Sequence, residues 1–407
     1  MNAKRLEANI EKLFELAPDE GGGATRLAYS PEEARAMLVV AQWMEEAALL
    51  PRLDRFGNLW GLPPHEDGPI VTSGSHVDTV PNGGRHDGAL GTVLAVEITK
   101  DLDGKLGVLV CAAEEAPRFG AGTLGSRQLV GKLSEEDLAS MRGADGVPAL
   151  EARSEYLELL SSIPSLKSPD PLSRIAAHVE VHIEQRRSLK EQGASVGIAT
   201  SVAGPARYRL HFGGATGHSG ETRIRERRDA LCAAAEAVLL VESLARKAVS
   251  TVATVGTVEV KPNALTAIPG EAVLGLDVRG TSAEERESLI LEIMDCGQEI
   301  SQRRGVDFSA QELSSSRPTA LDEGVVRLAE EIAHREHIPT VRCVSYAGHD
   351  AQHIAEKTPA TLMFVASSNG ISHAPEEDVA REDLARTYKL LTALLPELER
   401  NYGGGKR

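Results

Sequence analysis

Short apolar segments that end in polar side chains recur along the first half of the chain, and they limit the fold more than any other feature. Three of them are "PIVTSGSHVD" at 69–78, "KLGVLVCAAEE" at 105–115 and "AAHVEVHIEQ" at 176–185. Helix-like segments alternate with strand-like ones over residues 1–200, which is the pattern of a sheet flanked by helices. In open α/β sheets, ligands bind beyond the carboxyl ends of the strands. We therefore predict an α/β fold whose functional residues lie where these strands end.

The segment 176–185 alternates strictly between apolar and polar side chains, which predicts a strand with two unlike faces. Val179, Val181 and Ile183 would share the apolar face. His178, Glu180, His182 and Glu184 would share the polar face. We therefore expect His182 to be available for chemistry on that face.

A different order of elements begins at about residue 206. The pattern there is strand, helix, strand, strand, helix, strand, which is the β-α-β-β-α-β order of a ferredoxin-like α+β domain. After residue 317 the helix–strand alternation returns. Since 407 residues exceed what one hydrophobic core usually supports, two domains are expected. We predict a discontinuous α/β domain of residues 1–205 and 318–407 with a central mixed sheet, and an inserted ferredoxin-like domain of residues 206–317.

Charge and composition argue against several kinds of partner. A formal net charge of −16 repels nucleic acid phosphates and anionic membrane surfaces. No apolar run approaches the eighteen residues of a membrane span. The first segment, "MNAKRLEANIEKLFELA", has the spacing of an amphipathic helix and lacks the apolar core of a signal peptide. The four cysteines show no CxxC spacing, which is typical of reduced thiols. We expect a cytoplasmic protein with no nucleic acid or membrane partner.

The stretch "SGSHVDTVPNGGRHDGALG" at 73–91 concentrates side chains that can bind metal. Histidine nitrogen and carboxylate oxygen are the ligands that zinc and similar metals accept. Asp78, two residues after His76, can accept the second imidazole N–H and so fix the tautomer that binds a metal. Asp87 follows across a Gly-rich turn. Taken alone, the stretch could also be an ordinary polar loop.

Adjacent carboxylates, Glu114 and Glu115, follow the second strand segment. They repel each other unless cations or a proton separate their roles, and an economical arrangement gives one to a metal and leaves the other as a base. Considered alone, the pair could equally be two solvated loop glutamates. His182 and His373 complete a set large enough for two metals that share a carboxylate. The five candidate ligands are His76, Asp87, Glu115, His182 and His373.

Eight sequence motifs, spread in order over nearly the whole chain, resemble those of a known protein family. They are "GSHVDTVPNGGRHDGALG", "EEAPRFGAGTLGS", "VEVHIEQ", "YRLHFGGATGHSG", "RRDAL", "IPGEAVLGLDVR", "AGHDAQ" and "SHAPEE". Together they resemble the di-zinc aminoacylase and carboxypeptidase superfamily. Within it, the resemblance is to the hydantoinase/carbamoylase-type branch that contains N-carbamoyl-L-amino acid amidohydrolases and allantoate amidohydrolases.

The resemblance implies two divalent metal ions in each subunit. His76, Asp87 and His373 would hold one ion, and Asp87 would bridge to a second ion held by Glu115 and His182. Zinc is the metal that the family implies, although manganese, cobalt or nickel would accept the same ligand types.

The resemblance also implies catalytic roles. Glu114 would be the general base and later the acid to the leaving nitrogen, and Asp78 would orient His76. The inserted domain would be a lid through which two subunits form a homodimer. His218 on this lid would enter the active site of the other subunit and stabilise the oxyanion.

Substrate contacts are implied at five further positions. Arg207 and Arg279 match lid residues that bind the substrate carboxylate, and a guanidinium suits this role because it can donate two parallel hydrogen bonds. Gln185 is a further contact with the amide or ureido group. Thr266 stands where the family has a substrate-binding asparagine, and Asn263 lies three residues earlier.

Other departures from the family pattern surround the same pocket. Arg186 and Arg187 stand where the family has Gly-Pro, and "SGETRI" after His218 introduces Glu221 and Arg223. They leave the exact substrate, its stereochemistry and the native metal open.

From these residues we predict a metal-dependent amidohydrolase that cleaves a linear amide or ureido C–N bond in a small carboxylate substrate. An N-carbamoyl-L-amino acid or an allantoate-like compound is the expected substrate. An aminoacylase or dipeptidase would use the same catalytic residues on N-acyl or peptidyl substrates, so it is the alternative. A non-catalytic metal-binding carrier is a third hypothesis, but such a protein is expected to have lost Glu114 or a metal ligand, and none is replaced here.

Overall fold

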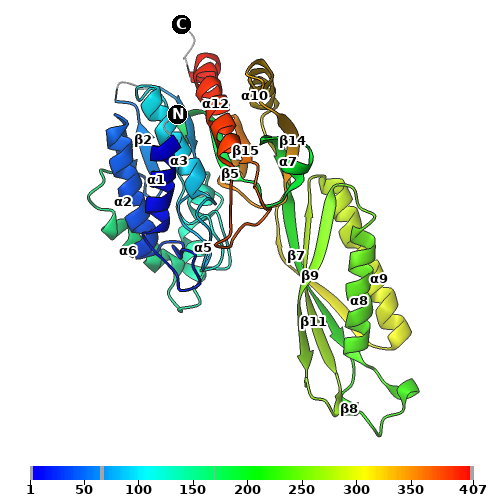
Figure 1. Cartoon of the computed structure of the whole chain (residues 1–407). Helices are drawn as coiled ribbons and strands as arrows, with labels where there is room; N and C mark the ends of the chain where they lie inside the picture. Colours follow the sequence, from blue (N-terminus) through cyan, green and yellow to red (C-terminus); the bar gives the residue numbers. More distant parts are fainter. Residues whose placement is uncertain (1–2, 65–67, 169, 404–407) are drawn as a thin grey trace. The chain divides into compact units, whose positions relative to one another are not determined.

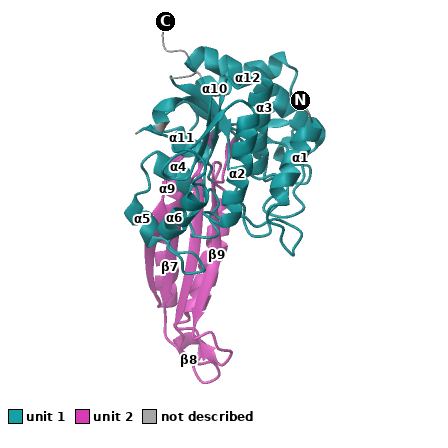
Figure 2. Ribbon diagram, turned by 90° about the vertical axis from the view of Figure 1, so that its left-hand side faces the viewer, with its two compact units in different colours: residues 1–200, 320–343, 348–407 teal, residues 201–319, 344–347 magenta. Residues whose placement is uncertain are grey.

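The computed structural model of the chain describes residues 3–64, 68–168 and 170–403. The chain divides into two compact units (Figure 1, Figure 2). Unit 1 comprises Met1–Thr200, Ala320–Cys343 and Gly348–Arg407, and unit 2 comprises Ser201–Thr319 and Val344–Ala347.

Nine strands form the larger sheet, most of which lies in unit 1. The strands are β1 (Leu50–Leu53), β2 (Leu59–Leu62), β3 (Ile70–Gly74), β4 (Gly107–Val110), β5 (Ile175–Ile183), β6 (Val196–Val202), β13 (Thr319–Ala320), β14 (Thr340–Ser345) and β15 (Ala360–Val365). Their spatial order is β1-β2-β4-β3-β5-β15-β6-β13, and β14 pairs with β6.

The middle of this sheet is parallel. β3 pairs in parallel with both β4 and β5, and β5 pairs in parallel with β15. Antiparallel pairs flank these four strands, β2 against β4 on one side and β6 against β15 on the other. The sheet is therefore mixed, and the predicted α/β class is confirmed.

Both faces of β5 are buried, which differs from the polar face that its alternation predicted. β5 lies between β3 and β15, so both of its edges are paired, and α3 (Ala89–Asp101) and α11 (Asp350–Ile354) pack on it. Strands covered on both faces normally carry continuous apolar runs. The polar side chains of β5 must therefore find partners inside the protein, and His178 does so with the Thr72 hydroxyl, 2.9 Å from its Nδ1 atom.

Helices cover the sheet of unit 1. They are α1 (Ala3–Phe14), α2 (Pro31–Glu46), α3 (Ala89–Asp101), α4 (Leu124–Leu129), α5 (Glu135–Ser140), α6 (Ala149–Leu159), α7 (Ser188–Glu191), α10 (Glu323–Arg335), α11 (Asp350–Ile354) and α12 (Arg381–Leu398), with 3-10 helix η1 (Pro171–Arg174) and π-helix η3 (Glu399–Gly403). α3 packs on β3, β4 and β5, whereas α11 packs on β5 and β15. Helix α12, red in Figure 1, also contacts α3. Within the described ranges, every helix is too short or too polar to cross a membrane.

Helix α3 approaches β5 so closely that only glycine fits at position 91. A Cβ atom on Gly91 would lie 1.9 Å from the carbonyl oxygen of Val181.

We expect Gly91→Ala to lower the free energy of unfolding by about 1–3 kcal/mol, because the helix or the strand must shift. Urea denaturation measures this. Gly68→Ala is the control, since an added Cβ there meets no described atom within 4 Å; equal destabilisation by both variants would contradict the packing argument.

Unit 2 is an α+β fold. Its elements are β7 (Gly204–Gly213), β8 (Gly217–His218), η2 (Ile224–Glu226), α8 (Ala230–Ala245), β9 (Thr251–Lys261), β10 (Ala267–Ile268), β11 (Glu271–Gly280), α9 (Ala283–Arg304) and β12 (Asp307–Ser315). Four strands form an antiparallel sheet in the order β12-β7-β11-β9. Burial alternates along β11, and α8 and α9 pack on this strand.

The long elements of unit 2 run β7, α8, β9, β11, α9, β12, the same order that the sequence pattern predicted. The limits differ, because residues 201–205, 318–319 and 344–347 also belong to this unit. The backbone N–H of Ala203 donates a hydrogen bond of 2.8 Å to the carbonyl of Ser345, and the guanidinium of Arg279 donates one of 2.9 Å to the carbonyl of Tyr346. These bonds attach 344–347 to unit 2. The lid and dimerisation roles of the unit stay predictions.

Candidate metal centre

The predicted metal ligands come from four neighbouring strands of unit 1. His76 lies two residues beyond β3, Glu115 lies beyond β4, His182 is near the end of β5, and His373 lies in the loop after β15. Because these strands are parallel neighbours, their carboxyl ends share one edge of the sheet. Asp87 is brought to the same edge by the loop that precedes α3.

Asp87 is shared by two groups of side chains whose possible ligand atoms lie within 4.8 Å of one another. One group is His76, Asp87 and His182, and the other is Asp87, Glu115 and His373. Asp87 Oδ1 lies 3.0 Å from His182 Nδ1, whereas Oδ2 lies 3.1 Å from His373 Nε2. Each carboxylate oxygen of Asp87 therefore faces a different group.

The division into groups differs from the one that the resemblance implied. It had placed His76 with His373 and Glu115 with His182. His76 and His182 instead lie together because they follow adjacent strands, and their ring centroids are 5.1 Å apart. Glu115 Oε1 lies 3.3 Å from His373 Nε2. The grouping in the structure therefore differs from the predicted one, whereas Asp87 is the shared residue in both arrangements. Which ligands bind a common metal stays a prediction.

Glu114 lies beside the first group without joining it. Its Oε2 atom is 3.7 Å from His76 Nε2, and the residue is 9% exposed. Neither of the two groups that share Asp87 includes Glu114. Glu114 therefore lies next to a ligand group without being part of it, and its role as general base stays a prediction.

Asp78 connects the two loops of the centre. Its carboxylate accepts backbone hydrogen bonds from Glu114 at 3.1 Å and Glu115 at 2.8 Å. Its Oδ1 atom also lies 3.3 Å from His76 Nδ1, although the hydrogen bond of that nitrogen is with the Asp78 carbonyl oxygen at 3.0 Å. Sequence reasoning anticipated the contact with His76 but not the bonds to the two glutamates.

The carboxylates of the centre have unusual pKa values. Burial and the charge of Glu115 raise the pKa of Glu114 well above its ordinary value, and burial and Asp87 raise the pKa of Glu115 to about 7. Burial also disfavours the charged form of Asp87, but the hydrogen bonds with His182 and His373 hold its pKa well below the usual range. Burial and like charge therefore raise the pKa values of the two glutamates, whereas hydrogen bonds with imidazoles lower that of Asp87.

The donor set fits divalent cations. Nε2 of His76 is buried and has no hydrogen-bond partner among the described residues. Several buried carboxylates converge there, and buried charge is costly unless it is paired or binds a metal. Imidazole and carboxylate are also the ligands that zinc, manganese, cobalt and nickel share. The geometry does not select one of these metals.

A third group lies behind His182, and sequence reasoning missed it. Glu180, His182 and His349 lie within 4.8 Å of one another by their possible ligand atoms. Glu180 Oε1 is 2.7 Å from His182 Nε2, and Glu180 also accepts a hydrogen bond from Ala351 N. Burial alone would lower the pKa of His182, but the charge of Glu180 outweighs burial and raises this pKa to about 10. The alternation of β5, which placed Glu180 and His182 on one face, contained the signal for this contact.

Arg207 and Arg279 lie together in unit 2, around a residue that sequence reasoning did not single out. Asp277 stands opposite Arg207 in the β7–β11 pair. Arg207 Nε lies 3.1 Å from Asp277 Oδ2, and Arg279 Nε lies 2.9 Å from Asp277 Oδ1. Burial opposes ionisation of Asp277, but Arg279 and Arg207 hold its pKa below the usual value. Asp277 therefore fixes both guanidinium groups on one sheet face.

The remaining predicted contacts are distributed over both units. In unit 2, Ser219 N donates a 3.0 Å hydrogen bond to the carbonyl of Thr266, so Thr266 lies beside His218. His218 is exposed, as is Asn263 in the loop after β9. In unit 1, Gln185 is half-buried just beyond β5. The departures at Arg186, Arg187, Glu221 and Arg223 are all exposed.

A mixed α/β fold that gathers histidines and carboxylates at the carboxyl edge of its sheet is the arrangement of a metal-binding α/β protein. The chain belongs to peptidase family M20/M25/M40, whose model matches residues 73–397. The family resemblance given by the sequence motifs is thereby confirmed.

Similar proteins match over nearly the whole chain. An N-carbamoyl-L-amino acid amidohydrolase of Geobacillus stearothermophilus is 34% identical over 395 residues, covering 95% of this chain and 96% of the relative. An allantoate amidohydrolase of Bacillus subtilis is 32% identical and covers 96% of each chain. An amidase of the hydantoinase/carbamoylase family from Burkholderia multivorans has a TM-score of 0.88 at 27% identity, with 98% of each chain covered.

Proposed function

We propose that the protein hydrolyses a linear amide or ureido C–N bond in a small carboxylate substrate, either an N-carbamoyl-L-amino acid or an allantoate-like compound. The observation that carries this proposal is the pair of ligand groups sharing Asp87 with Glu114 alongside. Full-length similarity to an N-carbamoyl-L-amino acid amidohydrolase and an allantoate amidohydrolase supports the ureido substrate class.

The proposal includes two divalent ions, with zinc as the metal expected from the family resemblance. His76, Asp87 and His182 would hold one ion, and Asp87, Glu115 and His373 the other. When bound, such ions supply Lewis acidity and lower the pKa of a water molecule to about 7.

The protein's own residues would then move one proton through the reaction. Glu114 accepts a proton as water attacks the carbonyl carbon, and it gives that proton to the departing nitrogen. A carboxylate beside the ligand groups suits both steps, because it can accept the proton and the resulting acid can release it. For a carbamoyl substrate, the products would be an amino acid, ammonia and carbon dioxide.

Further roles rest on the same proposal. His218 would stabilise the oxyanion in the active site of the other subunit of a homodimer, and unit 2 would be the lid that carries it. Arg207 and Arg279 would bind the substrate carboxylate, with Gln185, Thr266 and Asn263 near the scissile group. A cytoplasmic location is supported by the cysteines, since all four are described and none forms a disulfide.

A substrate panel tests the proposed reaction. Purified protein loaded with Zn²⁺ or Mn²⁺ is assayed for release of ammonia or amino acid from N-carbamoyl-L-amino acids, allantoate, N-acetyl amino acids and dipeptides. Turnover of a carbamoyl or ureido compound is the expected result. Turnover of only N-acetyl or dipeptide substrates would favour the aminoacylase or dipeptidase alternative, and no turnover of any compound would contradict both.

Arg279→Ala is expected to raise KM by about 10- to 100-fold with a smaller effect on kcat. A hydrogen bond to a charged group contributes about 1.5–3 kcal/mol, and 1.4 kcal/mol corresponds to a tenfold change in affinity. Steady-state kinetics and the thermal midpoint are measured together. Arg209→Ala is the matched control, because Arg209 is exposed on β7 two residues after Arg207. A lower midpoint with unchanged KM would show that Arg279 serves only to hold Asp277 and the Tyr346 carbonyl.

A further inference from the structure

One buried carboxylate in unit 1 takes no part in the groups described above, yet it contacts the loops of two of their ligands. Glu377 is 3% exposed and lies four residues after His373. Its Oε2 atom accepts backbone hydrogen bonds from His86 at 3.1 Å and Asp87 at 3.3 Å. Its Oε1 atom accepts a backbone bond from His373 at 2.9 Å and a hydroxyl bond from Ser372 at 3.2 Å.

The two oxygens of Glu377 thus divide their bonds between two loops that are far apart in the sequence. One loop precedes α3 and carries Asp87, and the other follows β15 and carries His373. Ser372 reinforces the connection, because its hydroxyl lies 3.3 Å from Asp87 Oδ2 as well. Bonds from N–H donors to a charged carboxylate are stronger than neutral ones, so the arrangement resists separation of the loops.

Gly84 is adapted to this contact. A Cβ atom at position 84 would lie 2.1 Å from Glu377 Oε2 and 2.6 Å from the Ala374 carbonyl oxygen. Only a residue without a side chain lets the loop come this close. Gly84, the second glycine of "NGGRHD", therefore permits the approach of the carboxylate to residues 84–87.

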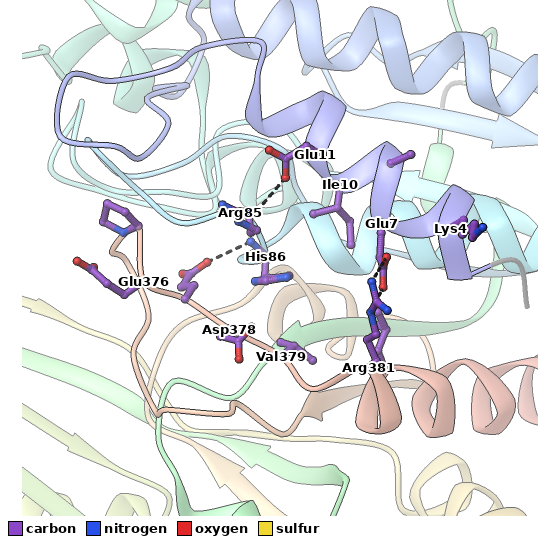
Figure 3. A pocket seen from close by; sticks show the side chains of 14 residues that line it. Lys4, Glu7, Ile10, Glu11, Arg85, His86, Glu376, Asp378, Val379 and Arg381 are labelled. Atoms are coloured by element: carbon purple, nitrogen blue, oxygen red, sulfur yellow. Dashed lines mark hydrogen bonds and ion pairs between the residues drawn. The ribbon is translucent and has the colours of Figure 1, made fainter.

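The preceding residue provides a natural comparison. Glu376 is exposed and lines a cavity of about 800 Å³ together with His86 and Asp378 (Figure 3). Helix α1 forms the opposite wall of this cavity through Glu7, Ile10 and Glu11. Glu377 lines the same cavity but is 3% exposed, because its carboxylate is bonded to the two ligand loops, whereas the side chain of Glu376 is exposed.

We propose that Glu377 is a positioning residue that holds Asp87 and His373 at the separation required to bind one metal ion together with Glu115. The proposal rests on the proposed metal centre. Residues that orient metal ligands through hydrogen bonds typically contribute 10- to 100-fold to metal affinity. Glu377 acts on two ligands of one group at once, through the backbone that carries them.

Titration of the metal-free protein with Co²⁺ tests this role. Visible absorption reports the coordination of each ion, and we expect two ions per chain in the wild type. Glu377→Gln keeps the size of the side chain but replaces one acceptor oxygen by an NH₂ group. This group cannot accept the backbone N–H bonds from one of the two loops. We expect its dissociation constant for one Co²⁺ to rise by about 10- to 100-fold. Glu376→Gln is the control and should bind both ions as the wild type does.

The outcomes separate the two proposals. Failure of the wild type to bind two Co²⁺ ions would overturn the metal centre itself. The thermal midpoint of the metal-free Glu377→Gln protein shows whether the variant folds. If it folds and binds both Co²⁺ ions with the affinity of the wild type, the positioning role alone is overturned. A protein that loses metal-free stability without any change in Co²⁺ affinity would show a merely structural role and would also overturn it.

A second variant decides the matter if Glu377→Gln does not fold. Ser372→Ala removes a hydroxyl that contacts both Glu377 and Asp87 and leaves the backbone bonds in place. The loss of one hydroxyl hydrogen bond predicts an increase of about two- to tenfold in one Co²⁺ dissociation constant. Unchanged affinity in this variant would contradict the proposal.

Discussion

Glu114→Gln is expected to lower kcat by about 10²- to 10⁴-fold while the protein keeps its full metal content. Glutamine has nearly the same shape but cannot accept a proton from the attacking water or return one to the leaving nitrogen. Glu114 belongs to neither group that shares Asp87, so its replacement should leave metal affinity intact. Elemental analysis and steady-state kinetics on the same preparation measure both quantities.

The neighbouring residue supplies the contrast for this experiment. Glu115 lies 3.3 Å from His373 and belongs to a ligand group, so Glu115→Gln should reduce metal content as well as activity. Added Zn²⁺ at high concentration should restore part of the activity of Glu115→Gln and none of the activity of Glu114→Gln. Full activity of Glu114→Gln would remove that residue from the role of base.

Asp87→Ala is expected to abolish metal binding in both groups and to lower kcat/KM by at least about 10³-fold. Lewis acid stabilisation of the transition state is worth several kcal/mol, and each 1.36 kcal/mol is a tenfold change in rate. The effect should exceed that of removing any other ligand, because Asp87 alone belongs to both groups that surround it. Metal stoichiometry after dialysis and kcat/KM with excess Zn²⁺ are the measurements.

Asp378→Ala is a suitable control, because Asp378 is exposed in the same loop as His373 and belongs to no ligand group among the residues that the structure describes. It should bind metal and turn over substrate as the wild type does. Retention of one tightly bound ion in Asp87→Ala would mean that the two groups do not depend on a common carboxylate.

Much of the centre could be predicted because its ligands follow strands whose apolar character is evident. Residues 69–78 and 105–115 each pass from an apolar run into His or Glu, and this transition marks a strand end in any α/β fold. His373 was identified from a different local signal, the loop-forming Gly, Ser and Pro residues around it. Local composition was sufficient for these positions because it determines where a strand stops.

The division of the ligands between two groups could not be predicted, because it depends on which strands are neighbours. His76 lies beside His182 only because β3 pairs with β5, and Glu115 reaches His373 only through the loops beyond β4 and β15. The same limitation applies to the contact of Asp277 with Arg207, which depends on the register of β7 with β11, whereas Arg279 lies two residues after Asp277 on the same strand. No spacing along the chain encodes these contacts.

The polar face expected for β5 shows a second kind of limitation. Alternation correctly grouped Glu180 with His182, but it suggested an accessible face where the structure has a buried one. Whether the second face of a strand is covered depends on helices from distant parts of the chain, here α3 and α11.

The sequence by itself determined the α/β class, the inserted α+β elements and the identity of the side chains able to bind metal, since these follow from short-range patterns of hydrophobicity and residue chemistry. The tertiary structure alone decided which candidate ligands lie together, that Glu114 stands apart from them, and that Glu377 joins the loops of Asp87 and His373. Those contacts form between residues separated by up to about three hundred positions, and strand pairing and helix packing, not local preference, bring them within hydrogen-bond distance.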